Sequence, residues 1–465
     1  MNYEDILSGR AGLAGVQWAL NSQSSRRMLR REAQAMLRPG YTPGAFELTR
    51  AKFKPGRNLL AYFTFPVQDA AGQVSHSIHL AAAWQNILDG DDHADGWNHL
   101  QEEADRLGLM PVQCELWRKN PNEGLELKIW PFDPEFPQLI HLSNPSYVAE
   151  IFASLGIIHD RKEMPVITAI RYRPKERHVL RYEIDRPEGP ERGRHLYAKL
   201  YSNAQSAAKA FGIANRVVDW LDANSLGLQG NRPEAISEED GVIFYPHAPG
   251  VPLSHQLHRS DRWLAKQLQT IGRALAALHN GPETLQAELK QNTFTNEAKV
   301  VKRASEHLQV LLPETYNQIL EILNQAEERY SSLLQEKPTF THSDFKSDHL
   351  LCTPQGLTLI DFDTCTLTDP ALDIGKFLAD LEWWFTLKGI SGVEEAQTEL
   401  LKGYLAERPS DQTLQERLRR AKLFHALILT KIVVRRVPIY KREWAAMTAR
   451  MIDRTAHVLR KTTAV

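Results

Sequence analysis

Two groups of acidic and basic residues stand close together in the stretch from 340 to 373. The first group contains Asp344 and His349, and the second begins at Asp361. Between them, residues 350–360 read as two short apolar strands around a Pro-Gln-Gly turn, a pattern typical of a β-hairpin. Because a hairpin brings its two ends together, we expect these three side chains to face one small volume.

Side chains of these types in one volume suit a particular chemistry. Carboxylate oxygens are preferred ligands of hard divalent cations, and a carboxylate can also orient a hydroxyl group and accept its proton. Phosphoryl transfer asks a protein mainly to position the reacting groups and to neutralise charge. The stretch therefore predicts a site that holds a hydroxyl and one or two cations beside a phosphoryl group.

The composition is that of an ordinary globular protein. The chain has 465 residues, of which 42% are hydrophobic and 24% charged, and its formal net charge is −1. This balance gives no overall attraction to nucleic acid or to a membrane surface. The N-terminus does not read as a secretory signal, and no apolar run is long enough for a membrane span. The three cysteines fit neither a zinc site nor a disulfide framework, so we expect a cytoplasmic protein. The charge balance and the lack of a long apolar run predict neither nucleic-acid nor membrane partners.

Strand patterns dominate the chain up to about residue 245, and helical patterns dominate after about residue 253. Segments 46–84 and 167–201 share one order of features: a basic and aromatic run, a proline, a strand, a turn and a second strand. We interpret them as an internal duplication, with two unrelated hairpins as the alternative. Only the second copy carries a lysine, Lys199, in its last strand; the first has alanines at 81–83.

This layout predicts an α+β protein with two lobes and an additional N-terminal domain. The expected divisions are an N-terminal cap domain at 1–150, a strand-rich lobe at 151–245 and a helical lobe at 246–465.

Several ordered motifs resemble the aminoglycoside phosphotransferase and choline kinase family of small-molecule kinases. The segment His342-x-Asp344-x-x-x-x-His349, followed by Ile360-Asp361-Phe362-Asp363, resembles the family's catalytic and metal loops. Three more segments resemble the family: Gly241-Val-Ile-Phe-Tyr-x-x-x-x-Gly250-x-x-Leu253, Leu268-x-x-x-Gly272-x-x-Leu275-Ala-x-Leu278-His279 and Asp369-Pro-Ala-Leu-Asp373. The resemblance covers about residues 165–385.

The resemblance implies a two-lobed protein-kinase-like fold, with a small antiparallel-sheet N-lobe and a helical C-lobe. Residues 1–150 would then form an extra α/β cap domain, which we interpret as a degenerate copy of the N-lobe. The layout is loosely similar to that of maltokinases, which also have an N-terminal cap ahead of the kinase core.

The resemblance also implies roles for individual residues of the two loops. Asp344 would be the catalytic residue that positions the acceptor hydroxyl and accepts its proton. Lys346 would either contact the γ-phosphate or remain solvated. Asp361 would bind the metal, and Asp363 would either add a second carboxylate or form hydrogen bonds within the loop.

His349 departs from the family pattern, which usually has asparagine at this position as a magnesium ligand. An imidazole is a poorer magnesium ligand and suits softer metals. Three interpretations are open: a nitrogen ligand to metal or phosphate, a hydrogen-bond donor that replaces one metal, or a lost metal site. As a separate possibility, the neighbouring Asp348 would supply an oxygen ligand instead. His342 is expected to brace the loop, and Asp373 either to brace it or to cap the N-terminus of a helix.

The expected nucleotide site lies in the strand-rich lobe. By resemblance, Lys199 would bind the α- and β-phosphates, although the helix after it contains no glutamate to pair with the lysine. Arg173 and Arg177 flank a turn in the position of the phosphate-covering loop, but this turn has no glycine. Its basic side chains would either contact phosphate or remain solvated. The backbone at Phe244 and Tyr245 would form the hinge that contacts adenine.

The sequence therefore predicts an ATP-dependent phosphotransferase that moves the γ-phosphate to a hydroxyl of a small molecule. The expected cofactors are ATP and Mg²⁺, with Mn²⁺ as a substitute, and the expected acceptor is a sugar, an aminoglycoside-like compound or an amino alcohol. The alternative is a catalytically impaired nucleotide-binding or scaffold protein on the same fold. A protein kinase is disfavoured because Asp369-Pro-Ala-Leu-Asp373 follows within ten residues of Asp363, which leaves little room for an activation segment.

Overall fold

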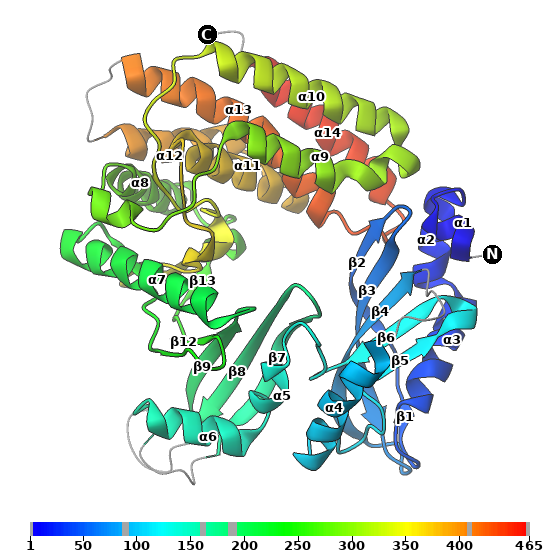
Figure 1. Ribbon diagram of the computed structural model, residues 1–465. Coiled ribbons are helices and arrows are strands. Elements are labelled where there is room, and N and C mark those ends of the chain that lie inside the picture. Colours follow the sequence, from blue (N-terminus) through cyan, green and yellow to red (C-terminus); the bar gives the residue numbers. More distant parts are fainter. Residues whose placement is uncertain (1–2, 86–92, 159–163, 185–192, 407–411, 462–465) are drawn as a thin grey trace. The chain divides into compact units, whose positions relative to one another are not determined.

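The computed structural model describes residues 3–85, 93–158, 164–184, 193–406 and 412–461. It divides into two compact units (Figure 1). The strand-rich unit comprises Met1–Ala208, Glu234–His247 and Pro438–Arg442. The helical unit comprises Lys209–Pro233, Ala248–Val437 and Glu443–Val465. The expected domain boundaries at residues 150 and 245 stay predictions.

The first sheet of the strand-rich unit is wholly antiparallel, in the order β1-β3-β4-β6-β5 with β2 paired to β3. Its strands are β1 (Thr42–Pro43), β2 (Glu47–Lys54), β3 (Asn58–Gln68), β4 (Val74–Gln85), β5 (Trp117–Asn120) and β6 (Leu125–Ile129). Four helices accompany it: α1 (Tyr3–Leu7), α2 (Gly12–Asn21), α3 (Gln23–Ala35) and α4 (His93–Arg106). Alternate residues of β3, from Leu59 to Val67, are almost fully buried, as expected when a strand turns one face to a core.

The second sheet is also antiparallel, in the order β11-β12-β9-β8-β7. Its strands are β7 (Val166–Arg173), β8 (Arg177–Ile184), β9 (Arg194–Leu200), β11 (Ala235–Ser237) and β12 (Val242–Pro246). The helices α5 (Gln138–His141) and α6 (Pro145–Ser154) contribute apolar side chains to the core of this sheet. Phe152 of α6 packs edge-on against Tyr182 and Phe244, with ring centroids 5.4 and 5.1 Å away.

The two predicted hairpin copies have the same turn geometry. A three-residue turn closes the pair Lys54↔Asn58 in the first copy and Arg173↔Arg177 in the second. Each turn begins with proline and has a left-handed second residue, Gly56 at φ 71° and Lys175 at φ 65°. A register shift also interrupts the first strand of each copy. These shared irregularities support the duplication.

The same alignment places an alanine where the second copy has its lysine. Two residues beyond the turns, Leu60 pairs with Ala83 in the first copy and Val179 pairs with Lys199 in the second. The first copy therefore has no lysine at the position proposed for phosphate binding. The predicted connection between the last two strands of the second copy falls mostly on 185–192, outside the described residues.

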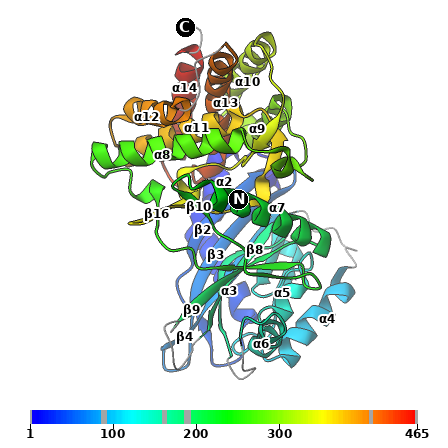
Figure 2. The ribbon, with the colours of Figure 1, turned by 90° about the vertical axis from the view of Figure 1, so that its left-hand side faces the viewer.

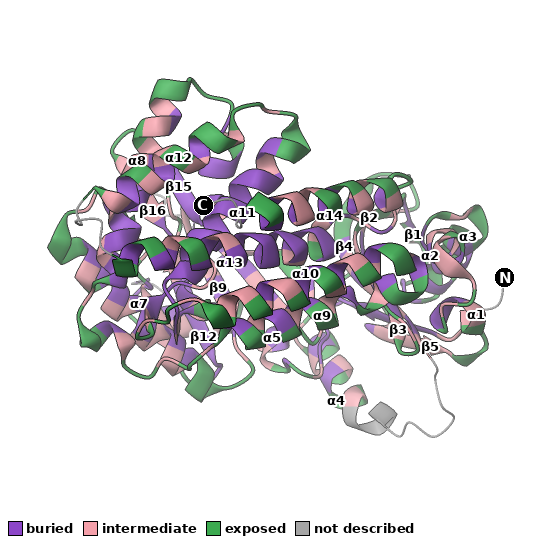
Figure 3. Ribbon diagram, turned by 90° about the horizontal axis from the view of Figure 1, so that it is seen from above, coloured by how far each residue is buried: buried purple, intermediate pink, exposed green. Residues whose placement is uncertain are grey.

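Seven long helices form most of the helical unit: α8 (Asp261–His279), α9 (Phe294–Leu311), α10 (Pro313–Ser332), α11 (Ala371–Lys388), α12 (Val393–Leu405), α13 (Gln412–Arg436) and α14 (Trp444–Lys461). Helix α13 packs against α9, α10, α11 and α14. Its residues 423–430 are all buried, which follows from an apolar composition on every side of the helix (Figure 3). A further helix, α7 (Ala204–Asn224), begins in the strand-rich unit and continues in the helical unit.

Two small sheets carry the loops between these helices. One has the order β10-β16-β15-β13, with β10 (Leu228–Gly230), β13 (Val251–Pro252), β15 (Leu350–Thr353) and β16 (Gly356–Leu359). The other pairs β14 (Thr339–Thr341) with β17 (Thr366–Thr368). The antiparallel β15–β16 pair confirms the hairpin predicted between the two charged groups.

One buried histidine of α13 makes the protein sensitive to acid. Burial, together with the charge of Arg454, lowers the pKa of His425 to about 3. The unfolded chain binds a proton near the ordinary pKa of 6.5, whereas the folded protein stays unprotonated, so this residue reduces stability as the pH falls from 6.5 toward 3. At pH 5 the cost is about 2 kcal/mol.

We therefore expect the free energy of unfolding, measured with urea, to fall less between pH 7.5 and pH 5 in His425→Leu than in the wild type. The difference should be about 2 kcal/mol. Equal losses in the two proteins would contradict a neutral buried imidazole.

Candidate active site

The two small sheets position the two charged groups as the sequence predicted. Strand β14 leads into the loop of Asp344, a short 3-10 helix at Ser347–His349 follows, and the β15–β16 hairpin returns the chain to Asp361. The backbone at Asp361 is left-handed, with φ 69°, and Ser343 has φ 60°. Positive φ is uncommon for residues other than glycine, although aspartate and asparagine adopt it more often than most, and such residues cluster at functional sites.

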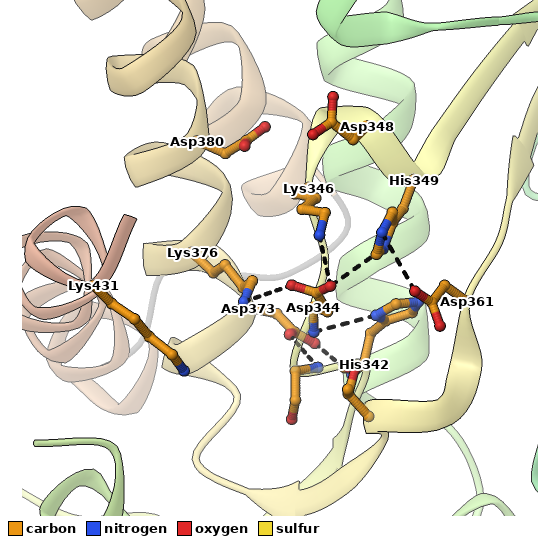
Figure 4. Close-up of polar contacts among 12 residues, drawn as sticks. His342, Asp344, Lys346, Asp348, His349, Asp361, Asp373, Lys376, Asp380 and Lys431 are labelled. Atoms are coloured by element: carbon orange, nitrogen blue, oxygen red, sulfur yellow. Dashed lines mark hydrogen bonds and ion pairs between the residues drawn. The ribbon is translucent and has the colours of Figure 1, made fainter. Parts of the chain in front are cut away.

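Asp344, His349 and Asp361 converge at the mouth of this hairpin. One ligand atom from each lies within 4.8 Å of those of the other two, a set able to hold a metal ion (Figure 4). The Nδ1 atom of His349 is 3.6 Å from Asp344 Oδ2, and its Nε2 atom is 3.5 Å from Asp361 Oδ2. Asp363, for which the sequence left open a second carboxylate ligand or a hydrogen bond within the loop, does not belong to this set.

Two lysines hold the Asp344 carboxylate. The Nζ atom of Lys346 is 2.7 Å from Oδ2, and the Nζ atom of Lys376, on α11, is 2.7 Å from Oδ1 (Figure 4). Burial opposes ionisation of this carboxyl group, but the neighbouring positive charges, Lys376 foremost, outweigh it and hold the pKa of Asp344 well below its usual value. Asp344 is therefore ionised throughout the neutral range.

His349 is neutral in the same range. Burial lowers the pKa of His349 to about 3, even though Asp344 and Asp361 favour its protonated form. Its Nδ1 atom is buried and has no hydrogen-bond partner within the described part of the chain. A neutral imidazole with an unpartnered nitrogen, next to a carboxylate, is a donor set that fits a divalent cation.

One face of α11 fixes the backbone of this loop. The carboxylate of Asp373 accepts hydrogen bonds from the backbone N–H groups of His342 and Ser343, each at 2.7 Å, which confirms the predicted brace. Asp380 accepts a hydrogen bond from the backbone N–H of Ser347 at 2.8 Å and another from its hydroxyl. His342 is buried, and its Nε2 atom lies 3.3 Å from the carbonyl oxygen of Ile360, in line with a structural role.

Sequence reasoning missed Lys376 and Asp380. Together with Asp373 they are spaced by three and four residues, which places all three on one face of a largely apolar helix. That spacing was the available signal, because charged residues in a buried helix need partners.

The remaining predicted residues belong to the strand-rich unit. Lys199 is half-buried on β9 and pairs with Val179 on one side and Ile243 on the other. The Phe244 side chain is fully buried in the core, and its carbonyl oxygen accepts a hydrogen bond from the backbone N–H of Glu234. Tyr245 is half-buried at the end of β12.

The glycine-free turn between Arg173 and Arg177 is anchored from a distant part of the sequence. The carboxylate of Asp133 accepts a hydrogen bond from the backbone N–H of Lys175 at 2.9 Å and lies 2.7 Å from the Nε2 atom of His178. Glu176 forms an ion pair with Lys52 of β2. These contacts hold a turn that contains no glycine.

Comparison with known proteins identifies the class of this chain. A model of the phosphotransferase enzyme family matches residues 181–414, about half of the chain, so the chain belongs to this family. The match confirms the predicted two-lobed, protein-kinase-like fold and the prediction of a small-molecule kinase. A search of curated proteins found no match.

Similar solved structures come from the same group of enzymes. Choline kinase from Cryptosporidium parvum Iowa II is 13% identical, with a TM-score of 0.48, over 68% of this chain and 96% of that one. An ethanolamine kinase from Plasmodium vivax is 11% identical, with a TM-score of 0.45, over 81% and 97%. A putative aminoglycoside phosphotransferase from Ralstonia eutropha JMP134 is 13% identical, with a TM-score of 0.44, over 68% and 97%.

Across the described residues, no helix is long and apolar enough to cross a membrane.

Proposed function

We propose that this protein transfers the γ-phosphate of ATP to a hydroxyl group of a small molecule. The observation that carries the proposal is the convergence of Asp344, His349 and Asp361 at one hairpin within a chain of the phosphotransferase enzyme family. In the transfer, the bond from the γ-phosphorus to the bridging oxygen of ADP breaks, and a bond from phosphorus to the acceptor oxygen forms.

Asp344 would orient the acceptor hydroxyl and receive its proton. The lowered pKa of Asp344 makes its carboxylate a weak base, so we expect the proton to move late, when bonding to phosphorus has made the hydroxyl acidic. Lys376 keeps this carboxylate charged and oriented. Lys346, on the other carboxylate oxygen, is the proposed contact to the phosphoryl group.

Asp361 and His349 would hold the divalent cation, which supplies charge neutralisation at the nucleotide phosphates when bound. The donor set contains an imidazole, which is a softer ligand than the amide usual in the family. We therefore propose that Mn²⁺ supports activity at least as well as Mg²⁺. Lys199, Arg173 and Arg177 are the proposed phosphate contacts of the strand-rich unit, and the backbone at Phe244 and Tyr245 is the proposed adenine contact.

A second candidate is a protein that binds nucleotide on this fold without turning it over. Two observations favour this candidate. Lys346 and Lys376 already contact both carboxylate oxygens of Asp344, and the metal set contains an imidazole in place of the amide usual in the family. Both candidates bind ATP, and only the first forms a phosphorylated product.

Nucleotide and metal binding can be tested by thermal unfolding. We expect ATP with Mn²⁺ or Mg²⁺ to raise the unfolding temperature of the wild type, because a ligand at a hundred times its Kd stabilises by about 2.7 kcal/mol. Asp361→Asn should lose the part of this shift that depends on the metal and keep the part seen with ATP alone. An undiminished metal-dependent shift in Asp361→Asn would refute the assignment of this ligand.

A further inference from the structure

The helices α11, α12, α13 and α14 lie together in the helical unit (Figure 2). Residues from these four helices line a large cavity. Its volume is about 660 Å³, within the range of small-molecule sites in proteins. Its walls are mainly apolar. The apolar side chains that line it are Leu378, Leu401, Leu418, Ala421 and Val458.

The cavity lies on the opposite side of α11 from the catalytic loop. Lys376 and Asp380 of α11 contact that loop, whereas Leu378 and Glu382 line the cavity. Leu378 follows Lys376 by two residues, and Glu382 follows Asp380 by two. Two residues along a helix correspond to a rotation of about 200°, so the cavity-lining side chains point away from the catalytic loop. The cavity is therefore separate from the site of Asp344 and Asp361.

Two polar groups of α13 line the cavity without partners. His425 is buried, and its Nε2 atom has no hydrogen-bond partner within the described residues. Lys422, half-buried, likewise forms no hydrogen bond or ion pair with any residue that the structure describes. A buried polar group without a partner costs free energy, and a ligand that supplies the partner recovers it.

The other charged groups are largely satisfied, which leaves an excess of positive charge. Arg454 lies between Glu382, at 2.6 Å, and Glu394, at 3.0 Å. The lining holds four basic side chains, Arg419, Lys422, Arg454 and Lys461. Arg419 pairs with Glu416 outside the lining at 2.7 Å, and Lys461 lies 3.8 Å from Glu394, so Lys422 carries the positive charge that no described residue balances. The positive charge of Lys422 would therefore attract an anionic group of a ligand.

We propose that this cavity is a second ligand-binding site, which takes an amphipathic anion. Its apolar body would lie between the four helices, its acidic group would pair with Lys422, and a hydrogen bond would form with His425. A carboxylate or sulfonate on an apolar ring or chain is the class of ligand that matches these groups.

The experiment uses the full chain and the fluorescent anion 1-anilinonaphthalene-8-sulfonate, whose emission rises in apolar sites. We expect saturable binding of one probe per chain to the folded protein, displaced by decanoate and much less by decylamine. Excess ATP with Mg²⁺ should not displace the probe, and Asp344→Asn should bind it as the wild type does. These two controls separate the cavity from the proposed phosphotransfer site.

Two variants locate the probe. Lys422→Gln should weaken binding about tenfold, the effect of losing about 1.4 kcal/mol of charge pairing, and Leu418→Trp should block it by filling the cavity. Lys402→Gln, on α12 but outside the cavity lining, should bind as the wild type does. Circular dichroism would verify that each variant is folded. Absence of saturable binding, equal displacement by decylamine, or unchanged binding in Lys422→Gln and Leu418→Trp would overturn the proposal.

Discussion

Replacing Asp344 with asparagine should lower the turnover number by about 10²–10⁴-fold, the usual contribution of a positioned acid or base. The amide keeps the size of the side chain but removes the charge that Lys346 and Lys376 contact, and it cannot accept the proton of the acceptor hydroxyl. Steady-state ATP turnover with an acceptor measures this directly. Nucleotide binding, followed by thermal unfolding, should persist in the variant, because Asp361 and His349 remain.

The matched control is Asp453→Asn, which removes a carboxylate of the same size from the exposed surface of α14. Asp453 accepts one hydrogen bond from Gln318 and contacts no part of the catalytic loop. We expect this control to keep wild-type turnover. Turnover in Asp344→Asn within a factor of two of the control would remove Asp344 from the mechanism.

Replacing Gly403 with alanine should destabilise the helical unit by about 3 kcal/mol, at the upper end of the range for overpacking a close contact. A Cβ atom on Gly403 of α12 would lie 2.1 Å from the carbonyl oxygen of Gln269 on α8. The contact is reciprocal, since a Cβ atom on Gly272 would lie 2.2 Å from the carbonyl oxygen of Leu400. Both contacts are to backbone, so the two helices would have to separate.

Urea denaturation of Gly403→Ala and Gly212→Ala tests this contact with the same chemical change at two places. A Cβ atom on Gly212 of α7 would meet only the guanidinium end of the Arg216 side chain, at 3.4 Å, which is ordinary contact. Alanine is favoured over glycine in a helix interior by about 0.5–1 kcal/mol, so Gly212→Ala should be neutral or stabilising. Equal effects of the two substitutions would contradict the close approach of α8 and α12.

The parts of the site that lie close in sequence could be predicted from it. The hairpin between His349 and Asp361 is a local structure, with a turn signal and apolar strands, and its ends necessarily bring the charged residues together. The brace by Asp373 followed from the family resemblance. For Asp363 the sequence left open a metal ligand or a hydrogen bond within the loop, and the structure places this residue in the short 3-10 helix at Phe362–Thr364, outside the set of three.

The missing parts depend on contacts between distant segments. Lys376 reaches Asp344 only because α11 packs beside the catalytic loop, and an apolar helix pattern does not reveal its neighbours. Asp133 anchors the Lys175 turn across forty-two positions of sequence, from a proline-rich connector that shows no periodicity. The close approach at Gly403 is likewise invisible in sequence, where this glycine reads as an ordinary weak point of a helix.

The central claim is that the site of Asp344, His349 and Asp361 transfers phosphate from ATP to a small-molecule hydroxyl. The most direct measurement follows the labelled γ-phosphate of ATP into product, with Mg²⁺ or Mn²⁺, over a panel of sugars, amino sugars and amino alcohols. We predict at least one phosphorylated acceptor, formed only with a divalent cation and lost in Asp344→Asn. No labelled product from any acceptor, in a protein that ATP stabilises, would contradict the claim and leave the nucleotide-binding alternative.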